Sequence, residues 1–248
     1  MTSSLVDLHC HLDLYPDHAE VVAESDRLKI FTLAVTTTPR AWPRNHELAS
    51  ATKHVRAALG LHPQLVKEYA NELTIWRDLL PRARYVGEVG LDAGRAYYAS
   101  FDAQKTVFET ILRDCAAAGG KILTIHSVRA AKAVLDMIET FLPPARGSAV
   151  LHWFTGTKAD AARAVKLGMY FSINWEMLRN ERHRELVSAL PLDRLLTETD
   201  GPFVQIDGRA ARPSDVAATV DELARLRSTP ASELADIVAA NLKRLVAT

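Results

Sequence analysis

Cysteine, glycine and proline are scarce in this chain of 248 residues. It holds two cysteines, Cys10 and Cys115, with 11 glycines and 11 prolines. Two cysteines without a CxxC spacing exclude a disulfide-stapled scaffold and indicate a reducing compartment. Collagen-like and disordered chains are excluded as well, because 48% of the residues are hydrophobic and 24% are charged. The composition is that of a globular protein with enough chain for a sizeable core.

Long apolar runs are also missing. The opening residues MTSSLVDLHCH contain neither the basic stretch nor the apolar stretch of a signal peptide. No run approaches the roughly 18 apolar residues that a membrane span needs. We therefore expect a cytoplasmic protein without a membrane partner.

Net charge is absent too, because 30 lysines and arginines balance 30 aspartates and glutamates. A protein that grips long nucleic acid over its whole surface usually carries a basic excess, since affinity comes from neutralising phosphates. The balance argues against that mode of binding. It leaves open a pocket in which bound metal ions neutralise one or two phosphates, because their charge is not part of the sequence.

Short β-rich runs alternate with helical patterns along the whole chain. Apolar residues at helical spacing predict helices over 101–118, 130–141, 213–226 and 231–245. Strands that alternate with helices eight times predict an α/β fold, a (β/α)8 TIM barrel that forms one domain over residues 1–248. The predicted strands are Leu5 to Cys10, Ile30 to Thr36, Val55 to Leu61, Tyr85 to Val89, Ile122 to His126, Ala149 to Trp153, Met169 to Ile173 and Leu195 to Thr199.

Polar residues collect where the predicted strands end, which is the face that carries the active site in barrels of this type. His9 and His11 lie two apart on one strand. They therefore share a face, about 7 Å apart along the backbone, and can converge on one metal, whereas Cys10 faces the other way. The expected metal ligands are His9, His11, Glu88, His126, His152 and Asp200.

Six ligands exceed what one catalytic metal needs, so two divalent ions are the simpler interpretation. Glu88 would bridge the ions. His9, His11 and Asp200 would hold one ion, and His126 and His152 the other. Imidazole and carboxylate groups without a thiolate suit Mg²⁺, Mn²⁺ or Zn²⁺. Two such ions against two carboxylates leave about two positive charges, which is a receptor for phosphate.

The same segments resemble those of the TatD family of metal-dependent nucleases, within the amidohydrolase-type barrels. Six segments occur in the family's order over nearly the whole chain: DLHCHLD from Asp7, GLHP from Gly60, GEVGLD from Gly87, HS at His126, VLHWFTG from Val150 and LLTETDGP from Leu195. The resemblance implies a two-metal hydrolase that cleaves DNA phosphodiesters with exonuclease-type activity.

Three segments at the strand ends depart from the family pattern. Arg129 stands one position later than the family's arginine, the loop after Asp92 is short, and Arg212 precedes a proline where the family often has asparagine. Together with TTTP from Thr36 and KILTI from Lys121, these segments resemble the QatD branch, found in the four-component Qat anti-phage defence system. This resemblance implies other Qat components as protein partners.

On the nuclease hypothesis, Asp200 and Glu88 are the expected catalytic residues. Asp200 would both ligate a metal and orient or deprotonate the attacking water. Glu198 and Asp92 are expected to orient metal-binding side chains. A salt bridge is the alternative role for Glu198, and a turn cap is the alternative for Asp92.

His62 and Arg129 are the expected substrate contacts, because both can hold a phosphate oxygen. A hydrogen-bonded histidine is the alternative for His62, and a solvated helix start is the alternative for Arg129. Phe203 and Trp175 lie near strand ends, where stacking on a terminal base stands beside simple packing.

Three functions remain open from the sequence. The first is a nuclease that acts on DNA ends or single strands, which the zero net charge favours over long duplexes. The second is an amidohydrolase or lactonase for small molecules on the same barrel. The third is a restrained or non-catalytic subunit of a multi-protein complex.

Overall fold

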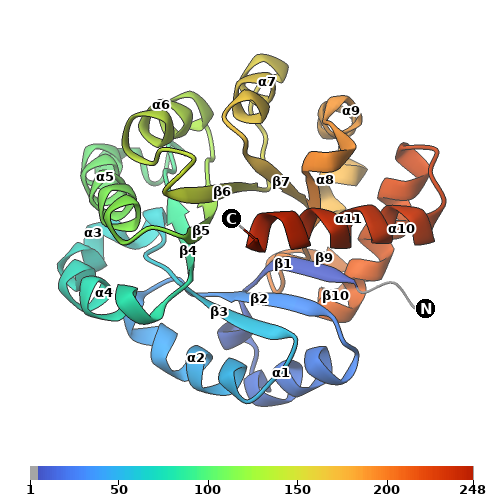
Figure 1. The fold of residues 1–248 in the computed structure, drawn as a ribbon, viewed down its shortest axis with the longest axis horizontal. Coiled ribbons are helices and arrows are strands. Elements are labelled where there is room, and N and C mark those ends of the chain that lie inside the picture. Colours follow the sequence, from blue (N-terminus) through green and yellow to red (C-terminus); the bar gives the residue numbers. More distant parts are fainter. Residues whose placement is uncertain (1–4, 248) are drawn as a thin grey trace. The chain divides into compact units, whose positions relative to one another are not determined.

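The computed structural model describes residues 5–247, and its main sheet consists of eight parallel strands in chain order (Figure 1). Helices connect successive strands, which confirms the predicted (β/α)8 TIM-barrel class. Every predicted strand is present, with ends that differ by a few residues. The strands are β1 Val6–Cys10, β2 Phe31–Val35, β3 Val55–Leu59, β4 Tyr85–Gly90, β5 Lys121–His126, β6 Gly147–His152, β7 Tyr170–Ile173 and β8 Leu195–Thr197, with a separate antiparallel pair, β9 Gln205–Ile206 and β10 Arg209–Ala210.

The helices follow the expected pattern, except that the region from Pro213 begins with the 3-10 turn η8, Pro213–Asp215, before α10. None of the helices within residues 5–247 is both long and apolar enough to cross a membrane. The α-helices are α1 His18–Arg27, α2 Trp42–Ser50, α3 Val66–Tyr69, α4 Leu73–Leu79, α5 Phe101–Ala118, α6 Ala131–Phe141, α7 Lys158–Lys166, α8 Trp175–Arg179, α9 Glu181–Ala189, α10 Val216–Leu226 and α11 Ala231–Val246.

The described chain divides into two compact units. Unit 1 comprises residues 5–34, 44–57 and 171–247, and unit 2 comprises residues 35–43 and 58–170. Each unit therefore combines segments that are distant in the sequence. The organisation as one domain over residues 1–248 stays a prediction, and residues 1–4 and 248 of that range lie outside the described part of the chain.

Unit 1 contains the first and last strands of the main sheet, and β8 lies beside β1. The backbone N–H of Asp200, just after β8, donates to the carbonyl of His9 in β1 over 2.8 Å. Helix α11 packs on both strands, and the Asn241 side chain donates to the carbonyls of Leu192 and Leu195. These bonds fix the relation between the end of β1 and the end of β8.

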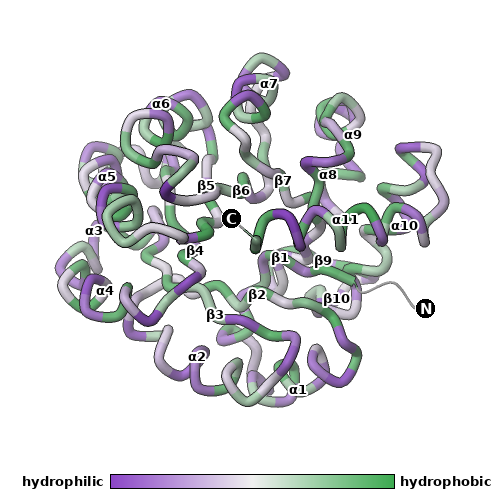
Figure 2. The backbone as a smooth tube through the Cα atoms, in the orientation of Figure 1, coloured by the Kyte–Doolittle hydropathy of each residue, from purple (hydrophilic) through white to green (hydrophobic). Residues whose placement is uncertain are grey.

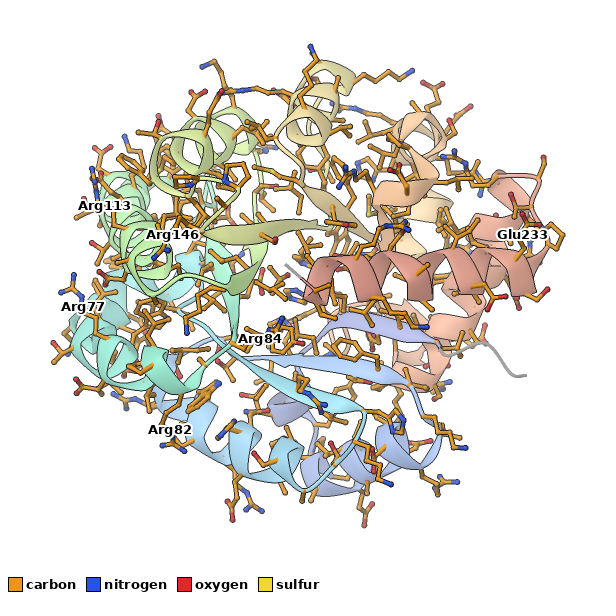
Figure 3. All side chains as sticks on the ribbon, viewed as in Figure 1. Arg77, Arg82, Arg84, Arg113, Arg146 and Glu233 are labelled. Carbon is orange, nitrogen blue, oxygen red and sulfur yellow. The ribbon has the colours of Figure 1, made fainter. Side chains whose placement is uncertain are left out.

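Unit 2 is built on β4, β5 and β6, with α5 and α6 packed beside each other (Figure 1). Three arginines hold its helices and loops, and Figure 3 labels them. Arg77 of α4 forms an ion pair with Asp114 of α5 over 2.7 Å, and the Arg113 guanidinium lies 4.2 Å from the ring centre of Phe141 in α6. Arg146 donates to two carbonyls at the end of α5, which it caps.

Amphipathic helices explain why these units are compact. The predicted apolar positions of α5, Val107, Phe108, Ile111, Leu112 and Cys115, are all buried. Helix α6 likewise buries Val134, Leu135 and Ile138. Along both helices hydrophobic and hydrophilic residues alternate, as Figure 2 shows. A spacing of three and four residues places the apolar side chains on one face, so that face turns to the sheet and the polar face to solvent.

Candidate metal centre

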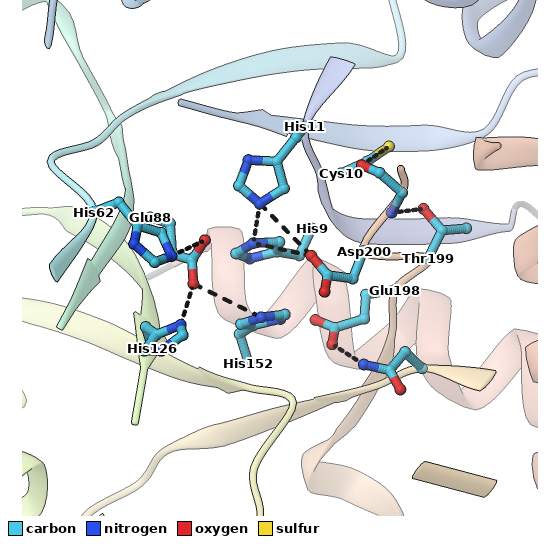
Figure 4. Close-up of polar contacts among 12 residues, drawn as sticks. His9, Cys10, His11, His62, Glu88, His126, His152, Glu198, Thr199 and Asp200 are labelled. Carbon is cyan, nitrogen blue, oxygen red and sulfur yellow. Dashed lines mark hydrogen bonds and ion pairs between the residues drawn. The ribbon is translucent and has the colours of Figure 1, made fainter. Parts of the chain in front are cut away.

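The first polar cluster, here called the His9 cluster, consists of His9, His11 and Asp200 in unit 1 (Figure 4). Two backbone hydrogen bonds of 2.8 Å place it, one from the N–H of Asp200 to His9 and one from the N–H of His11 to Gly201. Asp200 adopts a left-handed backbone with φ 51°, which turns the chain sharply after β8. The two imidazoles lie side by side, and their role as ligands of one metal stays a prediction.

The donor atoms of the His9 cluster have the spacing of metal ligands. The two Nε2 atoms of His9 and His11 lie 3.3 Å apart, and Asp200 Oδ1 lies 3.8 Å from the first and 3.6 Å from the second. Ligand atoms about 2.0–2.2 Å from a divalent ion stand roughly 2.8–3.8 Å from one another for ligand–metal–ligand angles between about 90° and 120°. All three side chains are buried. Their geometry and donor types therefore fit one divalent ion.

A buried carboxyl group that the sequence reasoning did not assign supports this cluster. Asp7, in β1, accepts two hydrogen bonds from Thr199, one from its N–H over 2.8 Å and one from its hydroxyl over 2.7 Å. Complete burial raises the pKa of Asp7 to about 8, although both bonds from Thr199 act to lower it. Asp7 thus ties β1 to the residue before Asp200. Its position two residues before His9 is the signal that could have indicated this role.

Glu198 lies beside the His9 cluster on the same segment (Figure 4). It accepts hydrogen bonds from the Ser172 hydroxyl and, over 3.1 Å, from the Asn174 amide. Both partners come from the end of β7, so two strands hold this buried carboxylate in place. Cys10 donates its thiol hydrogen to the Gly201 carbonyl over 3.4 Å, and complete burial raises the pKa of Cys10 well above its usual range. The thiol is therefore a small buried group that packs in the interior, as expected from the sequence.

The second cluster, here called the Glu88 cluster, consists of His62, Glu88, His126 and His152 in unit 2 (Figure 4). Glu88 is at its centre. One carboxylate oxygen lies 2.6 Å from His126 Nδ1 and 3.8 Å from His152 Nε2, and the other lies 3.2 Å from His62 Nε2. Donor atoms of His62, Glu88 and His126 all lie within 4.8 Å of one another. A buried carboxylate among three imidazoles is a donor set that suits a divalent ion.

Asp92 fixes the orientation of His126 from the side opposite Glu88. Its Oδ2 lies 3.0 Å from His126 Nε2 and accepts a hydrogen bond of 2.8 Å from Gln64. Burial acts to raise the pKa of Asp92, but the bonds from His126 and Gln64 hold it below its usual range. Burial acts to lower the pKa of His126, but Asp92 and Glu88 raise it to about 9. A carboxylate on the second ring nitrogen is typical of metal-binding histidines.

Asp92 also caps a turn, since its Oδ1 accepts from the N–H of Gly94 over 2.7 Å. Its own N–H donates over 2.7 Å to Gln104, a fully buried residue of α5. The Gln104 amide in turn donates to the carbonyl of Tyr97 and the hydroxyl of Ser100. Asp92 therefore caps a turn and also contacts His126, and its role beside a metal ligand stays a prediction. Gln104 was missed because nothing in a helical pattern marks a residue whose partners lie in a preceding loop.

The expected substrate contacts lie in different environments. His62 belongs to the Glu88 cluster, and its Nδ1 accepts from the N–H of Gln64 over 3.2 Å. Arg129 is exposed in the turn between β5 and α6, with a left-handed φ of 51°. Phe203 is 59% exposed, and its ring meets the ring of His11 edge to face at 5.0 Å. Trp175 is half-buried at the start of α8 under Arg179.

Comparisons with known proteins agree with this geometry. A family model described as TatD related DNase matches residues 6–247. The chain is similar to the deoxyribonuclease Tat-D of Schizosaccharomyces pombe, at 36% identity over 120 residues, which are 48% of this chain and 38% of that protein. It is also similar to the 3'-5' ssDNA/RNA exonuclease TatD of Citrobacter rodentium, at 28% identity over 92% of this chain and 91% of that protein.

Among solved structures, the chain is similar to YjjV, a TatD homologue from Escherichia coli K12. The TM-score is 0.88 at 26% identity, and the match covers 100% of both chains. The family model spans far more than half of the chain, and the clusters supply the donor types that a metal-dependent hydrolase requires. The chain belongs to the TatD family of metal-dependent hydrolases, which is described as TatD related DNase.

Proposed function

We propose that this protein is a metal-dependent nuclease that cleaves phosphodiesters at DNA ends or in single strands. The observation that carries the proposal is the spacing of 3.3–3.8 Å among the donor atoms of His9, His11 and Asp200. The names of two relatives, a deoxyribonuclease and an exonuclease for ssDNA and RNA, support the substrate class. The zero net charge supports ends or short single strands over long duplexes.

The proposal requires that the two clusters act together. His9, His11 and Asp200 would hold one ion, His126 and His152 the other, and Glu88 would bridge them. Divalent ions of this kind supply positive charge for phosphate oxygens and acidify the attacking water. Asp200 orients that water and takes its proton, and Glu88 holds the histidines of its cluster toward the reacting group.

Supporting roles follow from the contacts. Asp92 holds the His126 ring through the bond of 3.0 Å, and Glu198 fixes the segment that carries Asp200 through Ser172 and Asn174. Arg129 and His62 contact the substrate phosphates in this proposal. Within residues 5–247 the Arg129 guanidinium makes no ion pair or hydrogen bond, so it is available to a phosphate.

The proposal is tested with purified protein that is stripped of metal and reloaded with Mg²⁺, Mn²⁺ or Zn²⁺. End-labelled single-stranded and double-stranded DNA serve as substrates. We expect metal-dependent digestion, which His126→Ala abolishes and Asp200→Asn reduces about 100-fold or more. His54→Ala is the matched control, because His54 is a half-buried histidine that forms an ion pair with Asp26 and belongs to neither cluster. Near-normal digestion by Asp200→Asn contradicts its role.

Other outcomes select the remaining functions. No digestion with any metal, while about two ions per chain bind, favours a small-molecule amidohydrolase or lactonase. Activity that appears only with added proteins favours a restrained subunit of a complex. A defence role with other Qat components is the finer proposal, and it rests on the segments around Arg129, Asp92 and Arg212 rather than on any contact of the structure.

A further inference from the structure

Phe203 is a large apolar side chain that the fold leaves exposed beside a metal-binding histidine. It is 59% exposed, while the next residue, Val204, is buried at 1%. The N–H of Phe203 donates to the carbonyl of Asp200 over 2.9 Å, so the ring is carried by the turn that carries a ligand of the His9 cluster. Burial of an exposed aromatic ring is favourable by about 25 cal/mol for each Å² of apolar surface that is removed from water.

The backbone under Phe203 is tightly held. A Cβ placed on Gly201 would lie 2.0 Å from the hydroxyl of Tyr15 and 2.2 Å from the carbonyl of Ala211, so the turn is packed against both. The N–H of Ala211 also donates to the carbonyl of Val204 over 2.9 Å. The ring of Phe203 is therefore presented from a fixed turn and not from a loose loop, which reduces the entropy cost of binding a ligand.

Phe203 and His11 do not stack face to face. Its plane makes an angle of 86° with the plane of His11, at 5.0 Å between ring centres. Because one ring meets the other edge to face, the pair does not stack and His11 cannot cover both faces of Phe203. Leu14, whose N–H donates to the His11 carbonyl, is also 43% exposed. A second exposed apolar side chain therefore lies three residues from His11 in the sequence.

Two arginines that follow this turn in the sequence are already engaged by carboxylates. Arg209 forms an ion pair with Asp215 over 2.7 Å, and Arg212 forms ion pairs with Asp17 and Glu24. Neither guanidinium is therefore free to hold a phosphate. What the turn presents is a flat apolar ring, and the chemical class that matches such a ring next to a phosphate-binding cluster is an unpaired nucleobase.

We propose that Phe203 stacks on the base of the nucleotide whose phosphate is held at the His9 cluster. This inference rests on the proposed nuclease function and names its substrate as a strand end with an unpaired base. Every base has a flat face, so the site accepts any of the bases. It discriminates against paired ends and against phosphodiesters that carry no base. DNA and RNA ends share this chemistry.

The test compares Phe203→Leu, which keeps apolar volume, and Phe203→Trp, which keeps an aromatic face. Tyr98→Leu is the matched control, because Tyr98 is another exposed aromatic, at 64%, that stacks on Phe101 in unit 2. Each variant is loaded with Mg²⁺ and given oligonucleotides that end in a normal or an abasic nucleotide. We expect Phe203→Leu to lose roughly 5- to 150-fold in kcat/KM on the normal end and little on the abasic end.

A binding assay gives a second readout that does not depend on cleavage. In a His126→Ala background, which leaves the His9 cluster unchanged, 2-aminopurine at the strand end reports stacking through fluorescence quenching. We expect quenching that Phe203→Trp retains and Phe203→Leu removes.

The outcomes separate the two proposals. The stacking site is refuted, while the nuclease stands, if the wild type cleaves normal and abasic ends equally well. The same holds if Phe203→Leu in the His126→Ala background quenches 2-aminopurine fluorescence as strongly as His126→Ala alone. If no metal gives cleavage but quenching depends on Phe203, the nuclease is refuted while the base site stands. If Phe203→Leu alters only self-association, the ring is a protein contact and the stacking site is refuted.

Discussion

His126 lies between two carboxylates, and this arrangement predicts a steep pH dependence of metal binding. Asp92 and Glu88 raise its pKa to about 9, so at pH 7 the ring is protonated in the metal-free protein. A metal ion needs the neutral ring and must displace this proton. The pKa lies about two units above pH 7, and each unit corresponds to about 1.4 kcal/mol, so the proton costs roughly 3 kcal/mol of binding free energy.

We therefore expect the apparent Mg²⁺ affinity to rise about ninefold from pH 7 to pH 8 and about fivefold from pH 8 to pH 9, or about 50-fold in all. Asp92→Asn keeps an acceptor for His126 Nε2 and removes the charge, so the pKa of His126 should fall toward its ordinary value. The Mg²⁺ affinity of Asp92→Asn should then change less between pH 7 and pH 9. Calorimetry at both pH values, in buffers of different ionisation enthalpy, measures the affinity and the number of protons released.

Proton release is the sharper of the two readouts. At pH 7 a group with a pKa near 9 releases about one proton when it binds metal, whereas a group with an ordinary pKa of about 6.5 releases about 0.2. The difference between the wild type and Asp92→Asn isolates this proton from those of the other histidines. Equal proton release by the two proteins, or an affinity that is flat from pH 7 to pH 9, would refute the reasoning.

Three further substitutions test the packing. Gln104→Leu leaves the buried N–H of Asp92 without its acceptor, so urea unfolding of the metal-free protein should show a loss of about 1–3 kcal/mol, together with weaker Mg²⁺ binding. Thr157→Ala removes the capping box of α7 and should cost about 1 kcal/mol in the same assay without changing nuclease activity. Trp76→Ala empties a fully buried site and should cost about 3–5 kcal/mol, seen as a lower Tm.

The sequence was sufficient for the strands and for most of the polar residues at their ends. Parallel strands of a barrel end at one face, so residues such as Glu88 and His126, which come from neighbouring strands, are predicted to lie close together. The structure places their side chains 2.6 Å apart. The convergence of His9 and His11 follows from the two-residue period of a strand, although β1 ends at Cys10 and His11 lies just beyond it.

Residues that act through distant partners could not be found in the same way. Asp7 and Thr199 are 192 positions apart, and Gln104 reaches back to a loop from a helix whose pattern indicates only packing. Arg129 was expected near phosphate because of its type, but its left-handed backbone depends on a turn that no period in the sequence marks. Periodicity predicts faces of helices and strands, whereas these roles depend on which side chains the completed fold brings together.

The pairing of charges in the structure bears on the metal dependence that we propose for phosphate binding. Arg209 and Arg212, near the His9 cluster, are both engaged by carboxylates. The His9 cluster contains the carboxylate of Asp200. Without metal, this carboxylate repels a phosphate, and on the proposed function bound divalent ions would reverse the local sign. On the proposed function, affinity for nucleic acid should therefore depend strongly on metal loading, and a steep dependence on ionic strength would instead indicate many phosphate contacts by surface cations.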